Sequence, residues 1–277
     1  MSWLEALLLG ALQGLTEFLP VSSSAHLAIF PQLFGLADPG ASFTAVTQIG
    51  TEAAVIVFFR HDIWRIASAW TRSLVQPALR GTLDARMGWY VILGTIPIAV
   101  AGVLLESTIQ TVFRNLWLIA INLIVFGLVL GMADRFGRKV LPIERLNLPD
   151  AVMYGLAQTL ALVPGVSRSG ATISLGLLRG YTREAATRYA FLLAIPAVVA
   201  SGLFQLADVS ASAEPGMAKT IAATVVAFFV GYAVIGWLLR YVRTRSYWPF
   251  VWYRVALGTL VLVLLAIGTL QPDVPLG

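Results

Sequence analysis

The chain has no cysteine at all and very little charge. Its 277 residues include two His, and Asp, Glu, Lys and Arg together make up 12%, about half their share in a soluble domain. Without cysteine, a disulfide framework, a thiolate metal site and a cysteine nucleophile are excluded. So few charges cannot cover a water-facing surface. A soluble enzyme, a disordered scaffold and a nucleic-acid-binding domain are therefore excluded as well.

Apolar side chains take the place of the missing charge. Hydrophobic residues make up 58% of the chain, and the mean hydropathy is +0.82. The net charge of +5 fits the basic cytoplasmic loops of a membrane protein better than a polyanionic partner. The composition predicts an all-α polytopic membrane protein in which residues 1–277 form a single integral membrane domain.

Six segments are apolar over the length that a membrane-spanning helix needs, about 20 residues. They are residues 43–59, 87–106, 115–133, 185–206, 218–239 and 250–270. The first of them is short and carries Glu52. Residues 62–76 alternate arginine with Trp and Ile, which predicts an interfacial amphipathic helix.

Two further apolar regions, 3–34 and 149–180, are each interrupted by a proline. Pro20 and Pro164 lack a backbone donor and clash with the preceding turn, so the helix should break there. The serines that follow are good N-caps for a second half-helix. Irregular backbone at membrane depth persists only where it is buried in protein or lines a wet cavity. Both regions are therefore predicted to be re-entrant helix–loop–helix hairpins.

The basic residues orient these segments in the membrane. Arginine and lysine concentrate in loops 60–86, 134–148 and 240–249, whereas loops 107–114 and 207–217 hold one basic residue between them. With the basic loops in the cytoplasm, the six spans alternate, and the two hairpins enter from opposite faces. Together with weak sequence echoes between the halves, this predicts an inverted repeat of residues 1–133 and 149–270.

The polar residues at membrane depth gather at the two predicted helix breaks, and such residues are functional candidates by default. They are Gln13, Glu17, Ser22, Ser23, Ser24 and His26 in the first hairpin, and Ser167, Arg168, Ser169 and Thr172 in the second. Half-helix N-termini, an arginine fork and hydroxyl groups all suit phosphate oxygens. Glu17 would repel a bare anion but could hold a divalent cation, Mg²⁺ or Ca²⁺, that bridges phosphates. The pattern predicts a phosphate or diphosphate site.

Each of these residues also has a purely structural explanation. The serines could serve only as helix caps, His26 could bond a backbone carbonyl, and Glu17 could form a structural ion pair with Arg168. Glu52 is expected to face the bundle interior or to pair locally. The structural explanations weaken because so many polar residues fall at the same two helix breaks.

The residues at these breaks carry a resemblance to a known family. Gln13–His26, QGLTEFLPVSSSAH, resembles the first motif of the bacterial undecaprenyl-diphosphatase family, the BacA-type bacitracin-resistance proteins, and Pro164–Thr172, PGVSRSGAT, resembles the second. The resemblance covers essentially the whole chain. It implies an enzyme of the bacterial cell (inner) membrane that hydrolyses undecaprenyl diphosphate to undecaprenyl phosphate and phosphate. This reaction recycles the lipid carrier of cell-wall synthesis and gives bacitracin resistance.

The resemblance also implies six spans with two re-entrant hairpins in an inverted repeat, a site facing the periplasm, and a homodimer. The family's first motif allows Glu or Gln at its first position. Because this chain has Gln13 there, only Glu17 is left as a carboxylate for the metal.

The mechanism expected from these residues is phosphoryl transfer, which depends mostly on positioning and charge stabilisation. Ser23 would attack the terminal phosphorus, with His26 as its base, while Arg168 and a cation at Glu17 neutralise the diphosphate. The predicted substrate-binding residues are Ser167, Ser169, Thr172 and Gln13. His26 as the nucleophile, or as the base for direct attack by water, stays open.

Two other functions compete with hydrolysis. Broken helices that meet near the midplane are typical of secondary transporters, so a transporter or flippase of a phosphorylated prenyl lipid is the main alternative. Phosphate release by the purified protein in detergent, where no sidedness exists, would discriminate between them. A purely structural membrane subunit does not explain two polar hairpins.

Overall fold

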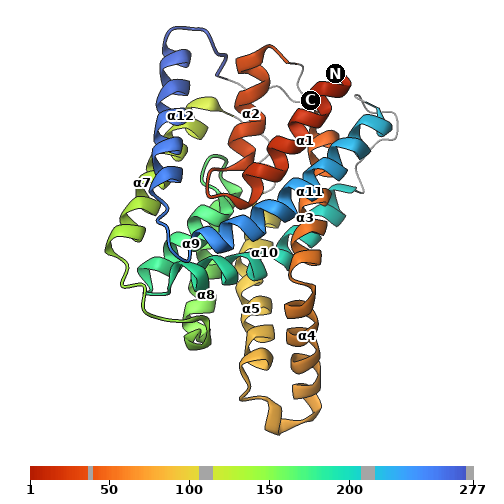
Figure 1. Ribbon diagram of the computed structural model, residues 1–277, viewed down its shortest axis with the longest axis vertical. Helices are drawn as coiled ribbons and strands as arrows, with labels where there is room; N and C mark the ends of the chain where they lie inside the picture. Colours follow the sequence, from red (N-terminus) through yellow and green to blue (C-terminus); the bar gives the residue numbers. More distant parts are fainter. Residues whose placement is uncertain (37–39, 106–114, 207–215, 273–277) are drawn as a thin grey trace.

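The computed structural model describes residues 1–36, 40–105, 115–206 and 216–272, and over these ranges it contains eleven α-helices and no β-strand (Figure 1). The helices are α1 (Trp3–Phe18), α2 (Ser23–Phe34), α3 (Gly40–Phe58), α4 (Arg60–Val75), α5 (Leu83–Leu104), α7 (Leu116–Phe136), α8 (Leu148–Thr159), α9 (Arg168–Leu178), α10 (Arg183–Leu206), α11 (Met217–Tyr241) and α12 (Trp248–Ala266). The all-α class is confirmed.

Five of these helices, α5, α7, α10, α11 and α12, are long and apolar enough to cross a membrane. They correspond to five of the six predicted spans. The remaining predicted span, 43–59, lies in α3, whose apolar part, Phe43–Phe58, is shorter than the other five. Loop 107–114 and residues 207–215 of loop 207–217 lie outside the described residues.

The outward faces of α7 and α11 are apolar, as lipid contact requires. On α7 the exposed side chains include Ile121, Val125, Leu128 and Met132, and on α11 they include Ile221, Val225 and Phe229. They recur every three or four residues, so each set forms one stripe along its helix. A soluble protein rarely exposes such continuous apolar surface.

Both predicted helix breaks are confirmed. α1 ends at Phe18, ahead of Pro20, and α2 begins at Ser23 after the N-cap Ser22. In the second hairpin α8 is followed by a 3₁₀ turn, and α9 begins after the N-cap Ser167. Ser22 and Ser167 share an unusual backbone conformation, with φ of 76° and 74°. The two turns are thus built alike; whether they re-enter a membrane stays a prediction.

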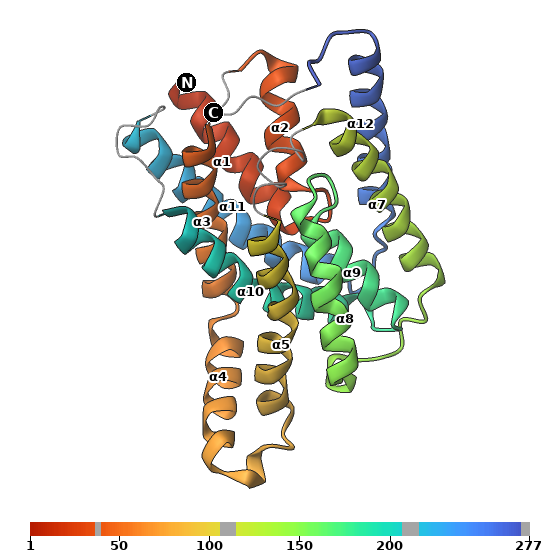
Figure 2. The ribbon, with the colours of Figure 1, turned by 180° about the vertical axis from the view of Figure 1, so that it is seen from behind.

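The two hairpins exchange partners with the opposite half of the chain. α1 packs along α11, and α8 packs along α5 (Figures 1 and 2). Glycine allows both close approaches, because a side chain on Gly10 would collide with the backbone of Ala223, and one on Gly155 with the backbone of Gly94. An inverted repeat would produce such an exchange. The repeat of residues 1–133 and 149–270 stays a prediction.

The predicted amphipathic helix is present as α4, but it does not lie across the end of the bundle. It runs antiparallel to the first part of α5, and the pair projects along the long axis of the molecule (Figures 1 and 2). Gly88 of α5 faces the ring of Trp70 on α4. Packing against α5 therefore determines the direction of α4.

Candidate active site

Arg254 of α12 holds the turns of the two hairpins together. Its side chain is fully buried, with 0% exposure. The guanidinium donates to the carbonyl of Pro20 in the first turn at 3.1 Å, and to those of Gly165 and Val166 in the second at 2.8 and 3.0 Å. It also donates to Leu123 on α7. Because these partners come from distant segments, Arg254 fixes the distance between the two turns.

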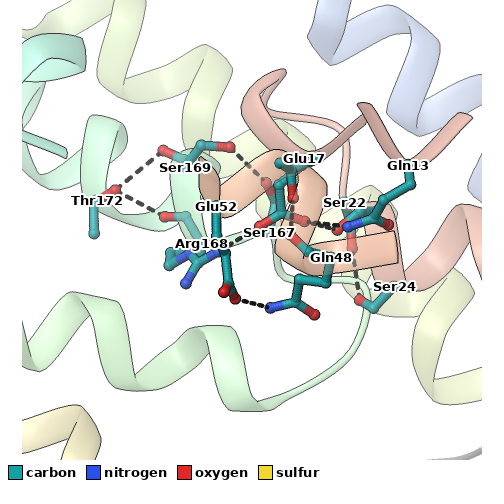
Figure 3. A network of polar contacts seen from close by, with 12 residues as sticks. Gln13, Glu17, Ser22, Ser24, Gln48, Glu52, Ser167, Arg168, Ser169 and Thr172 are labelled. Atoms are coloured by element: carbon teal, nitrogen blue, oxygen red, sulfur yellow. Dashed lines mark hydrogen bonds and ion pairs between the residues drawn. The ribbon is translucent and has the colours of Figure 1, made fainter. Parts of the chain in front are cut away.

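Glu17, in the last turn of α1, is the centre of the polar network between the hairpins (Figure 3). One carboxylate oxygen, Oε1, forms an ion pair with the guanidinium of Arg168. The other, Oε2, accepts hydrogen bonds from Ser23 Oγ at 2.6 Å and from Gln13 Nε2 at 3.2 Å. Three other predicted site residues therefore contact the carboxylate of Glu17. The ion pair between Glu17 and Arg168, one of the structural explanations above, is formed.

His26 is directed away from this carboxylate. It is 1% exposed, and its Nδ1 lies 2.7 Å from the carbonyl oxygen of Ser22. A carbonyl can only accept, so Nδ1 carries the proton, and Nε2 accepts from the hydroxyl of Tyr253 at 2.6 Å. The two rings are stacked, with an interplanar angle of 7°. In the described part of the chain Ser23 is therefore hydrogen bonded to Glu17 and not to His26.

The hydroxyls of the second hairpin bind mainly to its own backbone. Ser167 accepts from the amide of Gly170 at 3.2 Å, and Thr172 donates to the carbonyl of Arg168 at 2.8 Å. Ser169 reaches across to the first hairpin and donates to the carbonyl of Leu19 at 3.1 Å. Of the three hydroxyls, Ser169 is the one that lines a cavity with Glu17 and Arg168. The roles predicted for these hydroxyls in substrate binding stay predictions.

Two features of the site were missed from the sequence. Tyr253 and Arg254 are adjacent in α12 and serve the two hairpins, and an arginine inside an apolar span was the signal that could have revealed them. Glu52 of α3 was expected to face the bundle interior. It does so, and it also lines the cavity of Glu17 and Arg168.

The sequence comparisons agree with this geometry. The family model described as bacitracin resistance protein BacA matches residues 6–260. The chain belongs to the BacA family. A Nocardioides protein named undecaprenyl-diphosphatase is 62% identical over 97% of this chain and 98% of its own length. Proteins of the same name from Thermobifida fusca and Micrococcus luteus are each 56% identical, over 99% and 98% of this chain and 94% and 100% of their own.

Family membership and the five long apolar helices together make this BacA chain a multi-pass membrane protein. The resemblance carried by the Gln13–His26 and Pro164–Thr172 motifs is confirmed by the match over residues 6–260. Both motifs lie where the turns of the two hairpins meet.

The residues of this BacA chain fit a divalent cation of the hard, oxygen-binding kind. No group of three or more His, Asp and Glu side chains comes together within the described ranges. Two carboxylates, those of Glu17 and Glu52, do line the same cavity. Mg²⁺ is commonly held by one or two carboxylates together with phosphate oxygens of the substrate. Two carboxylates beside the predicted phosphate site would meet this requirement.

Proposed function

We propose that this BacA-family chain hydrolyses undecaprenyl diphosphate to undecaprenyl phosphate and inorganic phosphate, the activity for which its relatives are named. The contact of Ser23 with Glu17, and of Glu17 with Arg168, carries the proposal. These contacts join a nucleophile, Ser23, a base, Glu17, and the guanidinium of Arg168 in one hydrogen-bonded group. A site that only bound its ligand would not need the nucleophile to be paired with a base.

In the proposed reaction Ser23 Oγ attacks the terminal phosphorus of the diphosphate. Its proton passes to Glu17 Oε2, which lies 2.6 Å away. The bond from the terminal phosphorus to the bridging oxygen breaks, and undecaprenyl phosphate leaves with the bonding electrons. Water then hydrolyses the phosphoserine, and inorganic phosphate is released.

The remaining residues supply positive charge and hydrogen-bond donors. Arg168 offers a planar fork that matches two phosphate oxygens, and the N-termini of α2 and α9 add backbone N–H groups and the positive ends of their dipoles. A bound divalent cation would neutralise charge on the diphosphate. His26 as the nucleophile, or as the base for water, remains the rival scheme, and it would require Nε2 to leave Tyr253.

The test is phosphate release from undecaprenyl diphosphate by the purified chain in detergent. Ser23→Ala should reduce turnover by at least about 100-fold, because the loss of a catalytic nucleophile typically costs more than that. Acid quenching during turnover should trap a phosphoserine at position 23. Near-normal turnover by Ser23→Ala, or a trapped phosphohistidine, would overturn the serine scheme.

The main alternative is transport, and the broken helices of the two hairpins favour it. A carrier would need the same anion site but would release no phosphate. Because a detergent micelle has no two sides, phosphate release there supports the hydrolase. Its absence, with the lipid bound, would favour the carrier.

We also propose that the site faces the periplasm. This orientation places the arginine-rich segment 60–86, which contains α4 and the turn into α5, in the cytoplasm. The C-terminal end of α2 lies at the opposite end of the molecule (Figure 1). The homodimer implied by the family is proposed on the resemblance alone, and light scattering in detergent would test it.

A further inference from the structure

Glu52 is a buried carboxylate that the proposed reaction does not use. It is 7% exposed, and its Oε1 accepts a hydrogen bond from Gln48 Nε2 at 3.3 Å. No arginine or lysine of the described residues lies within ion-pairing distance of it. Burying an ionised carboxylate is costly unless it is paired or binds a metal. Glu52 has no direct ion-pair partner among the described residues.

The carboxylate is directed into the active site. Glu52 lines the same cavity as Glu17, Arg168 and Ser169, and it lies beside Arg168 in the polar network of Figure 3. Gly202 of α10 makes room for it, because a side chain there would collide with Glu52 Oε2. The cavity leaves about 20 Å³ free, which is enough for one water molecule or one ion.

The charges around this cavity do not suit a diphosphate as they stand. Two carboxylates, Glu17 and Glu52, face one guanidinium, that of Arg168, and this guanidinium is already paired with Glu17. With both carboxylates ionised the group is net negative, and it would repel an anionic head group. A divalent cation would make the group net positive, and its remaining coordination positions would be open to phosphate oxygens.

We propose that Glu52 and Glu17 together hold a divalent cation of the Mg²⁺ or Ca²⁺ class, which binds the diphosphate of the substrate beside Ser23. Carboxylates are preferred ligands for these ions. Gln48 positions Glu52 through its hydrogen bond to Oε1. Gln13, which contacts Glu17 through its amide, is neutral and adds no negative charge, so Glu52 is the second acidic ligand. The inference rests on the proposed function, because the diphosphate completes the coordination.

The experiment measures Mn²⁺ binding by electron paramagnetic resonance, on the full chain in detergent with methylene diphosphonate as the head-group analogue. Wild type should bind Mn²⁺, and Glu52→Gln should weaken its affinity by at least about 10-fold, the lower limit for disturbing even an outer-shell metal partner. Glu144→Gln is the matched control. It makes the same change at an exposed carboxylate outside the site and should bind as wild type does.

A second variant leaves both carboxylates in the chain and instead changes the position of Glu52. Gly202→Ala should displace Glu52 and weaken Mn²⁺ binding as well, so the test does not depend on Glu52→Gln alone. Wild-type affinity in these two variants, or no Mn²⁺ binding by wild type, would overturn the inference. Phosphate release by wild type is scored separately. Mn²⁺ binding without phosphate release would retain the metal site and contradict the proposed hydrolase.

Discussion

The side chains around Glu17 do not contribute equally to the active site. Ser23 and Gln13 donate neutral hydrogen bonds, whereas Arg168 supplies the positive charge. The side chain of Glu17 is 10% exposed and that of Arg168 is 21% exposed, so water screens the pair only in part. Removing Arg168 would leave a largely buried carboxylate without a counter-ion.

Arg168→Ala should therefore affect both stability and turnover. We expect the free energy of unfolding to fall by up to about 3 kcal/mol, the low end for buried pairs because Arg168 is partly exposed. Turnover should fall by about 10²–10³-fold if the guanidinium also stabilises the transition state. Arg168→Lys should restore little activity, because an ammonium lacks the planar fork. Melting temperature and phosphate release, measured on the same preparations, check both effects.

The double variant separates the two roles of Arg168. Glu17→Gln, added to Arg168→Ala, removes the stranded carboxylate and should recover stability. It should not recover turnover. If Arg168→Ala melts lower but hydrolyses the substrate at the wild-type rate, the residue is structural and has no catalytic role.

At the scale of the elements, the site depends on two turns that come from opposite halves of the chain. Both turns have a serine N-cap at positive φ, Ser22 and Ser167, a conformation that costs about 1–3 kcal/mol and persists only where its surroundings enforce it. Arg254 of α12 supplies part of that support, through the carbonyls of Pro20, Gly165 and Val166.

Arg254→Met should loosen both turns together. The apolar side chain keeps some of the packing but removes every donor, and each buried carbonyl left without a partner costs about 1–3 kcal/mol. Several carbonyls lose their donor at once, so the variant should melt far below wild type and release phosphate slowly. Arg243→Met is the matched control, since the ion pair of Arg243 with Glu184 is exposed and contributes about 0–1 kcal/mol. Equal melting temperatures in the two variants would contradict the role of Arg254.

At the scale of the whole molecule, five helices are long and apolar enough to cross a membrane, and the basic loops predict the orientation of the protein. Gly81, in the turn before α5, and Thr269, after α12, are both exposed. The predicted topology puts Gly81 in the cytoplasm and Thr269 outside. Because the chain contains no cysteine, one introduced thiol would report one position without background.

Gly81→Cys and Thr269→Cys should therefore differ in labelling by a membrane-impermeant maleimide. In spheroplasts the thiol at position 269 should react, and the thiol at position 81 should react only after lysis, since arginine-rich loops stay on the cytoplasmic side. The opposite pattern would reverse the topology and place the site toward the cytoplasm.

The local features of this protein were determined by the sequence. The membrane class, five of the spans and both helix breaks followed from hydropathy and from Pro20 and Pro164, because these properties act within one continuous segment. Glu17, Ser23 and Arg168 could be named as candidates because each lies in a short continuous motif beside one of these helix breaks. The orientation of α4 was not predicted, because its packing against α5 depends on a separate segment.

Only the tertiary structure decided which side chains meet. Glu17 and Arg168 are 151 positions apart, and His26 and Tyr253 are 227 positions apart. The structure hydrogen-bonds Ser23 to the carboxylate of Glu17 and His26 to Tyr253, and it places Glu52 in the cavity that Glu17 and Arg168 line. These contacts result from helices that pack across the two halves of the chain, such as α1 against α11. A local sequence pattern determines where a helix begins and ends, but not which distant helix lies against its face.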